Sequence, residues 1–250
     1  MRRTVSIDCF PESVARYSRE YAIVAIDVIR ATTTAITAVA AGRRCHPVSS
    51  LEAAFRKAAT LEQPILAGEL GGDMPDGFDM NNSPAELEAR TDRHRPVVML
   101  SSSGTKLITL AAVRGPAFLA CFRNYAATAR HLASRYSKVA VIGAGSRSEF
   151  REEDQMCCAW IAELLIGAGF EPENPSVTRI IERWSGAPPE SCLGGRSANY
   201  LIRSGQSHDL TFILARVNDL EAVFPVTNDE VQMIPEPRLT ERAATVSAQT

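Results

Sequence analysis

The apolar and polar positions of this chain divide it into short apolar runs, each followed by a longer segment with helical spacing. The first clear pair is the apolar run at 23–26, which ends at Asp27, and the segment 32–41, which stops at Gly42. A run of this length is typical of a buried strand, and a glycine often ends a helix. The same order recurs at 44–48 and 51–61, 64–67 and 84–89, 96–100 and 106–113, 116–120 and 124–136, and 138–142 and 153–168. This alternation predicts an α/β fold in which helices pack on a mostly parallel or mixed sheet.

The two ends of the chain carry weaker signals. We expect an edge strand that ends at Asp8, loops at 171–176 and 184–190, a helix at 191–203, and either a helix or a strand at 210–217. Residues 1–235 are interpreted as one α/β domain, or as two subdomains that meet near 115–140. Residues 236–250 form a polar tail that we expect to be poorly ordered.

Composition narrows the class of protein. The 250 residues are 45% hydrophobic and 22% charged, with a formal net charge of -2, as is ordinary for a globular protein. This balance argues against general binding of nucleic acid or of an anionic membrane. No apolar run reaches transmembrane length, and the first residues are too polar for a signal peptide, so we expect a cytoplasmic protein. The 6 cysteines lack paired zinc spacing and are expected to be free thiols.

Asp27 and Arg30 are the first candidates for chemistry. They follow a predicted strand and precede a predicted helix, and ligands of open α/β sheets bind at that edge. A helix amino terminus favours anions, a carboxylate can hold a metal, and a guanidinium can bind a phosphate through two hydrogen bonds. The alternative is an Asp–Arg ion pair that only stabilises the end of the strand, with threonines capping the helix.

Acidic and hydroxyl side chains recur at the other predicted junctions between a strand and a helix. They are Glu69, Asp79 with Asn82, the loop 101–105, and Glu153 with Asp154. Such loops converge at the rim of a parallel sheet, where several carboxylates would repel one another unless a cation neutralised them. Oxygen ligands of this kind suit magnesium. Each acid on its own is more often solvated or a helix cap.

Two loops have features of anion-binding sites. The loop 101–105 (SSSGT) follows an apolar strand and opens a helix, so its N–H groups and hydroxyls are able to hold a phosphate, although it lacks the P-loop pattern. Simple capping is the alternative. The segment 143–148 (GAGSRS) matches a dinucleotide fingerprint only in part, and its Arg147 is a candidate cation for an anionic substrate tail. The 4 histidines show no metal-ligand spacing, and only His208, beside Asp209, is kept as a possible neighbour of a site.

Between Val24 and Asp154 the chain resembles the 2-phosphosulfolactate phosphatase family (ComB-like) in a series of short motifs. The motifs are Asp27-Val28-Ile29-Arg30-Ala31-Thr32-Thr33, Gly68-Glu69, Gly77-Phe78-Asp79, Asn82-Ser83-Pro84, Ser103-Gly104-Thr105, Asn124, Gly143-Ala144-Gly145 and Glu153-Asp154. The resemblance implies a magnesium-dependent phosphatase with a three-layer α/β/α fold. The family is named for release of phosphate from 2-phosphosulfolactate, a step toward coenzyme M, and a different small phosphorylated acid remains open for this chain.

The resulting assignment gives each motif a role. The predicted catalytic residues are Asp27, Arg30, Glu69 and Asp79. The predicted substrate-binding residues are Arg30, Thr32, Asn82, Ser102, Ser103, Gly104, Thr105, Asn124 and Arg147. The predicted ligands of Mg²⁺ are Asp27, Glu69, Glu153 and Asp154. Water activated by the metal and an aspartyl-phosphate formed on Asp27 both remain open as mechanisms.

Two other classes of protein remain as rivals. One is a noncatalytic protein that binds a phosphorylated metabolite or a nucleotide at the same rim, and the other is an oxidoreductase built on the loop 143–148. The expected partner in the favoured interpretation is a small phosphorylated acid, with neither nucleic acid nor membrane, and we expect a homodimer because compact α/β enzymes often pair.

Overall fold

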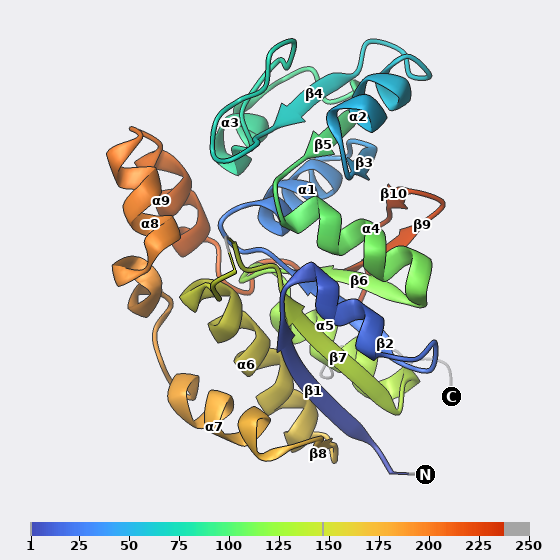
Figure 1. The fold of residues 1–250 in the computed structure, drawn as a ribbon, viewed down its shortest axis with the longest axis vertical. Helices are drawn as coiled ribbons and strands as arrows, with labels where there is room; N and C mark the ends of the chain where they lie inside the picture. The colour runs from blue at the N-terminus through green and yellow to red at the C-terminus, as the bar shows by residue number, and fades with distance from the viewer. Residues whose placement is uncertain (1, 147, 238–250) are drawn as a thin grey trace, which may run out of the picture.

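The computed structural model describes residues 2–146 and 148–237, and it contains the predicted pairs of strand and helix (Figure 1). Through the long helix α6 the elements are β1 (Thr4–Cys9), η1 (Pro11–Arg16), β2 (Ala22–Ile26), α1 (Ala31–Ala40), β3 (Cys45–Val48), α2 (Leu51–Ala58), β4 (Ile65–Gly68), α3 (Pro84–Ala89), β5 (Val97–Leu100), α4 (Gly104–Arg114), β6 (Ala117–Ala120), α5 (Tyr125–Arg135), β7 (Lys138–Gly143) and α6 (Glu152–Gly167). The prediction of an α/β fold with a mixed, mostly parallel sheet is confirmed.

Local sequence accounts for where these elements begin and end. All five residues of β2 are buried, as expected of an apolar run in the middle of a sheet. The side chain of Ser50 accepts a hydrogen bond from the N–H of Ala53 and caps α2. Ser83 caps α3 in the same way, with Pro84 at the first helical position. α6 ends before Gly169, whose φ of +90° lies in the left-handed region that favours glycine.

The sheet holds two parallel sets of strands that run in opposite directions. Its order is β4-β5-β3-β10-β9-β6-β2-β7-β1-β8. β3, β4 and β5 are mutually parallel, as are β6, β2, β7, β1 and β8. Between the sets, β9 is antiparallel to both β6 and β10, and β10 is antiparallel to β3. The sequence predicted convergence at one common rim, whereas here the carboxyl ends of two opposed sets face each other.

The last third of the chain adds further elements. They are β8 (Glu171–Pro172), α7 (Pro175–Trp184), η2 (Pro189–Gly194), α8 (Arg196–Arg203), α9 (Ser207–Ala215), β9 (Ala222–Thr227), β10 (Glu230–Val231) and β11 (Ile234–Pro235). The expected helix 191–203 contains α8, whereas the expected loop 171–176 contains β8 and the start of α7, and the expected loop 184–190 contains the end of α7 and the start of η2. The segment 210–217, left open between helix and strand, is mostly helix. Glu236, at the start of the predicted tail, is buried and lies 2.8 Å from Nδ1 of His131. Residues 238–250 lie outside the described part of the chain.

Helices cover both faces of the sheet, and one pair of helices, α8 and α9, lies beside it. α4 packs on β2, β3 and β6, while α5 and α6 pack against each other, with α6 on β1 and β7. Figure 1 shows α8 and α9 at the side of the molecule, level with the region between β4 above and β7 below. Among the described residues no helix has the length and apolarity to cross a bilayer. All 6 cysteines are free, and five of them are buried.

Candidate active site

A cavity of about 550 Å³ lies between the two sets of strands and helix α8. Its wall is built from the segments that directly follow β2, β4, β5 and β7, together with Asn82 and one side of α8. The lining residues are Asp27, Ile29, Arg30, Glu69, Gly71, Gly72, Asn82, Ser102, Ser103, Gly145, Ser146, Glu149, Arg151, Asp154, Arg196, Ser197, Tyr200 and Leu201. Size and enclosure of this kind suit a small-molecule site.

Asp27 lies where β2 ends, and its backbone is fixed by Thr32. The Thr32 hydroxyl accepts the N–H of Asp27 at 3.0 Å and lies 2.8 Å from the carbonyl oxygens of Asp27 and Ala120, one of which accepts its proton. Burial raises the pKa of the Asp27 carboxyl to about 6, and the nearby Glu69 adds to the effect. The N–H of Ala31, in the first turn of α1, opposes the shift by donating to the carboxylate.

Gly104 makes room for that carboxylate. A Cβ at position 104 would lie 2.2 Å from Oδ2 of Asp27 and 2.5 Å from Cβ of Ala31. No real side chain tolerates such distances, so the start of α4 approaches Asp27 this closely only because residue 104 is glycine. Gly104, in the loop predicted to bind phosphate, therefore leaves space for the acid.

Asp154 and Glu153 lie in the first turn of α6, where Asp154 lines the cavity and Glu153 lies behind its wall. Oδ1 of Asp154 accepts the N–H of Val28 at 2.8 Å, and Oδ2 accepts that of Gly145 at 3.3 Å. Burial, followed by the charges of Asp27 and Glu153, raises the pKa of Asp154 well above its ordinary value. Burial likewise raises the pKa of Glu153 to about 7, an effect that the Ser197 hydroxyl partly offsets. Three carboxyl groups thus influence one another in a site that disfavours their charged forms.

The donor set was compared with what a hard divalent cation requires. Within residues 2–146 and 148–237, no group of three His, Cys, Asp or Glu side chains is arranged to hold a metal ion. Neither carboxylate oxygen of Glu153, which is 0% exposed, makes a hydrogen bond of ordinary geometry in that part of the chain. Magnesium, however, often binds through only one or two carboxylates and completes its shell with water and substrate phosphate. The crowded acids with raised pKa values fit a cation of that kind.

Glu69 connects two loops of the cavity wall. Its Oε1 accepts the N–H of Ser102 at 2.7 Å, and its Oε2 accepts the N–H of Gly72 at 2.7 Å and the hydroxyl of Ser102 at 3.0 Å. The Ser102 hydroxyl also accepts the N–H of Gly71 at 2.7 Å. Both oxygens of Glu69 therefore hold the loops after β4 and β5 together.

Arg30 lines the cavity while its charge is neutralised from α9. Its Nη1 donates to Oδ2 of Asp209 and to Oε1 of Gln206, each at 2.6 Å, and its Nη2 donates to Oδ1 of Asn81 at 3.2 Å. The Arg30 and Asp209 side chains are 4% and 0% exposed. His208 and Asp209 were expected at most to neighbour a site, and the structure places Asp209 as the partner of Arg30.

The cavity wall includes only some of the predicted site residues. It holds Asp27, Arg30, Glu69, Asn82, Ser102, Ser103 and Asp154. Six others lie off the wall, namely Thr32, Asp79, Gly104, Thr105, Asn124 and Glu153. Thr105 exchanges hydrogen bonds with Ser101, Asn124 bonds the backbone of Cys121 and Leu119, and exposed Asp79 accepts the N–H of Leu66. Arg147 lies outside the described residues.

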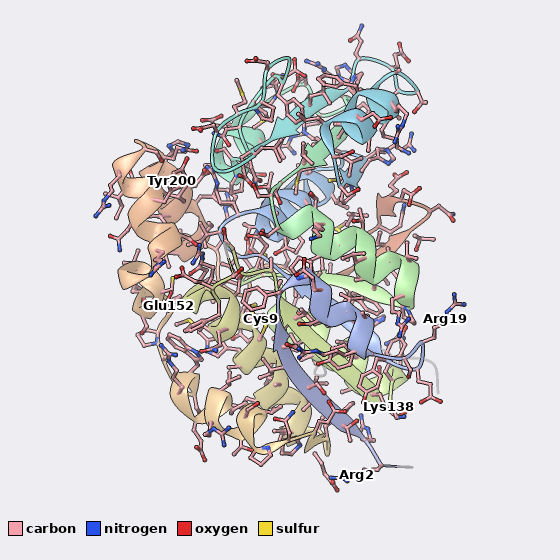
Figure 2. All side chains as sticks on the ribbon, viewed as in Figure 1. Arg2, Cys9, Arg19, Lys138, Glu152 and Tyr200 are labelled. Carbon is pink, nitrogen blue, oxygen red and sulfur yellow. The ribbon has the colours of Figure 1, made fainter. Side chains whose placement is uncertain are left out.

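Sequence reasoning missed the contribution of α8 and of the segment before α6. Arg196 and Tyr200, one helical turn apart on α8, both line the cavity, as do Glu149 and Arg151. Tyr200, labelled in Figure 2, donates its hydroxyl to the carbonyl oxygen of Gly72 at 2.8 Å and so bridges two walls. The spacing of Arg196 and Tyr200 within a predicted helix was the available signal, but nothing local indicates which way that helix faces.

Comparison with known proteins gives one consistent result. A family described as 2-phosphosulpholactate phosphatase matches residues 9–229. A protein of Clostridium perfringens named "Probable 2-phosphosulfolactate phosphatase" is 29% identical over 84% of this chain and 88% of its own length. Two further relatives carry the same name. The one from Carboxydothermus hydrogenoformans is 31% identical over 86% of this chain and 89% of its own length, and the one from Deinococcus radiodurans is 33% identical over 82% of this chain and 86% of its own length. The matched span includes every described residue of the cavity wall.

Proposed function

Because this chain belongs to the 2-phosphosulpholactate phosphatase family, we propose that it hydrolyses a small anionic phosphomonoester with Mg²⁺ as cofactor, and that 2-phosphosulfolactate is its substrate. The products would be sulfolactate and inorganic phosphate. The observation that carries the proposal is the meeting of Asp27, Glu69 and Asp154 with the hydroxyls of Ser102 and Ser103 on the wall of one cavity. A protein that only bound phosphate would gain nothing from so many acids.

The proposal gives distinct tasks to the residues of the wall. In it, Ser103 and Asn82 donate hydrogen bonds to phosphoryl oxygens, and both residues line the cavity. Arg30 adds positive charge, although Asp209 fixes it in place. Glu69 keeps the loops after β4 and β5 at the distance that this binding requires. Phosphoryl transfer depends mainly on such positioning and charge stabilisation.

Asp27 is the central residue in either mechanism. With Asp154 or Glu153 it would hold Mg²⁺, which would neutralise charge on the phosphoryl oxygens and lower the pKa of a bound water. Alternatively, its carboxylate oxygen attacks phosphorus, the bond to the alcohol oxygen breaks, and water later releases phosphate from the aspartyl group. In both cases the leaving alcohol oxygen takes up a proton. Reduction of the reacting enzyme with borohydride, which converts an aspartyl-phosphate to homoserine, would identify the second mechanism if homoserine appeared at position 27.

Phosphate release from a panel of small phosphorylated acids tests the proposal. The panel includes 2-phosphosulfolactate and is assayed with magnesium and then with a chelator, with Glu62→Gln, an exposed residue remote from the cavity, as control. Release that the chelator abolishes, and that magnesium restores, is the expected result. Release that survives exhaustive chelation would contradict the cofactor. If a folded sample with magnesium released no phosphate from any member of the panel, the result would favour a noncatalytic protein that binds phosphorylated metabolites.

A further inference from the structure

Two arginines that no motif indicated face each other across a corner of the cavity. Arg151 is the residue directly before α6, and Arg196 is the first residue of α8. Both line the cavity, and both are directed at one carboxylate, that of Glu149. The chain therefore brings two guanidinium groups from separate elements to the same place.

The charges at this corner do not balance. Arg196 donates a hydrogen bond to Oε2 of Glu149, while Nη1 of Arg151 lies 3.5 Å from the same oxygen. That Nη1 is buried and makes no hydrogen bond with any residue in the described part of the chain. One carboxylate thus serves two guanidinium groups. A buried N–H group of a cation without an acceptor is costly, so the geometry calls for a further anion.

The other charged residues of the wall are already committed. Arg30 is neutralised by Asp209, and the oxygens of Asp154 accept the N–H groups of Val28 and Gly145. Arg151 does act at a distance on Asp27, because its charge lowers the pKa of that carboxyl slightly against the larger effect of burial. A purely electrostatic role near Asp27 is thus the alternative to a binding role.

We propose that Arg151 and Arg196 together bind an acidic group of the substrate other than the phosphate, a carboxylate or a sulfonate, and so determine specificity. This rests on the proposed function, since it concerns the same cavity. Guanidinium groups bind planar or trigonal oxyanions through paired hydrogen bonds, which a mostly buried Arg151 and an exposed Arg196 are able to supply from two sides. The side chains are 12% and 71% exposed, so Arg151 forms the inner part of the receptor and Arg196 the part that faces solvent.

Glu149 competes with the acid group for both arginines. Its side chain is 43% exposed and is able to turn toward solvent. An arriving acid group must displace it from both arginines, so Glu149 weakens binding of the acid. Glu149→Gln is therefore expected to lower KM for the acidic substrate.

Four phosphate esters separate the possible roles. 2-Phosphosulfolactate carries a sulfonate and a carboxylate, 2-phospholactate only the carboxylate, 2-sulfoethyl phosphate only the sulfonate, and isopropyl phosphate neither. For Arg151→Gln and Arg196→Gln we expect KM to rise about 10- to 100-fold for the substrate whose acid group is bound, with kcat within about threefold, because a hydrogen bond to a charged group is worth that factor. Isopropyl phosphate should be hydrolysed as well by the variants as by the parent. Arg203→Gln, an exposed residue on the same helix, is the matched control and should change nothing.

The kinetic constants on the four esters distinguish a binding role of the two arginines from an electrostatic role near Asp27. An equal loss of kcat on all four esters would overturn the proposal and assign Arg151 to the electrostatics around Asp27. Calorimetric titration with sulfolactate, which needs no turnover, separates this proposal from the proposed function. Binding by the parent that Arg196→Gln weakens at least 10-fold supports the receptor even if no ester is hydrolysed, whereas equal binding by both proteins refutes the receptor even if hydrolysis is intact.

Discussion

Nη1 of Arg30 lies 2.6 Å from Oδ2 of Asp209, a residue 179 positions further along the chain. This ion pair joins the junction after β2 to α9, and both side chains are almost fully buried. Oδ1 of Asp209 accepts the hydroxyl of Ser83 at 2.7 Å and the N–H of Ala85 at 3.1 Å, so the same carboxylate also fixes the start of α3. Asp209 therefore positions one wall of the cavity from the last third of the chain.

Replacing Asp209 by Asn tests that role. The variant leaves a buried guanidinium without its counter-ion, which in other proteins costs about 3–5 kcal/mol, and we expect a loss of about 3 kcal/mol in the free energy of unfolding because the amide keeps some hydrogen bonds. We also expect kcat/KM to fall, since Arg30 shifts. Urea denaturation and phosphate release measure the two effects. His208→Gln is the control, because that exposed side chain lies 4.0 Å from Asp209 and closer, at 3.4 Å, to the exposed Glu86, and a similar loss in both variants would contradict the assignment.

Gly104→Ala is expected to impair catalysis more than folding. The added methyl group would lie 2.2 Å from Oδ2 of Asp27, so the carboxylate must move, and an error of about 1 Å at a reacting group costs on the order of 100-fold in rate. The measurement is kcat with the far-ultraviolet circular dichroism of each protein. Gly167→Ala makes the same change at the end of α6, where nothing lies within 4 Å of the new Cβ, and it should leave kcat unchanged. Normal kcat in Gly104→Ala would show that Asp27 is not fixed by this contact.

Much of the fold was predictable because the strands through β7 are short apolar runs that alternate with helices. Strand β2 and helix α1 lie where their pattern placed them, and so do β7 and α6. The direction of the strands was not predictable, since it is set by β9 and β10. Their residues carry no distinctive local signal, and their pairing with β6 and β3 joins positions about a hundred or more apart in the chain.

The sequence indicated a cavity residue only where a reactive side chain also lies at a predicted junction between a strand and a helix. Asp27 and Glu69 directly follow strands, and the rule that loops at carboxyl ends form sites found both of them. Thr105 and Asn124 follow the same rule, yet their side chains bond the local backbone, because turns compete with ligands for such groups. Arg196 and Tyr200 required knowledge of how α8 packs beside the sheet, which no pattern within α8 contains.

Asp92→Ala is expected to destabilise the protein far from the cavity. Asp92 pairs with Arg43, whose side chain is 0% exposed, at 3.0 Å, and it also binds Arg90 and Arg95. These partners, Arg90 first, hold the pKa of the Asp92 carboxyl well below its usual range. Its stabilising effect is therefore complete above the ordinary carboxyl pKa near 4 and is lost as the pH falls toward the lowered value.

We expect Asp92→Ala to lose about 3 kcal/mol at pH 7, because it removes the carboxylate paired with the buried Arg43, and to lose less as the pH drops below about 4. Urea denaturation at both pH values provides the test. Asp76→Ala, at an exposed loop position, should stay within about 0.5 kcal/mol of the parent. If the difference in the free energy of unfolding between Asp92→Ala and the parent grew as the pH fell, the pH dependence would have the opposite sign and would contradict the prediction.

Asp27→Asn is expected to abolish turnover and to stabilise the chelated protein. The loss of rate should be at least of order 100-fold, as for other groups that stabilise transferring charge. Burial holds the pKa of Asp27 at about 6, above its value in an unfolded chain, so the folded state binds the extra proton between about pH 4 and pH 6 and loses stability as the pH rises through that window. With chelator present, Asp27→Asn should melt higher than the parent at pH 8, and the gap should narrow at pH 5. A lower melting temperature at pH 8 would contradict the cost assigned to the charge.

Tyr200→Phe tests whether the bridge across the cavity matters for binding. The Tyr200 hydroxyl donates to the carbonyl oxygen of Gly72 at 2.8 Å and connects α8 to the loop that Glu69 holds. Loss of one neutral hydrogen bond is worth about 1 kcal/mol, so KM should rise about fivefold while kcat stays near that of the parent, because no reacting group moves. Tyr21→Phe removes a hydroxyl of the same kind, which donates to Glu173 at 2.7 Å away from the cavity, and it should leave KM unchanged. A fall in kcat without a change in KM would instead mean that the bridge positions the acids around Asp27, since only the rate of the chemical step depends on their alignment.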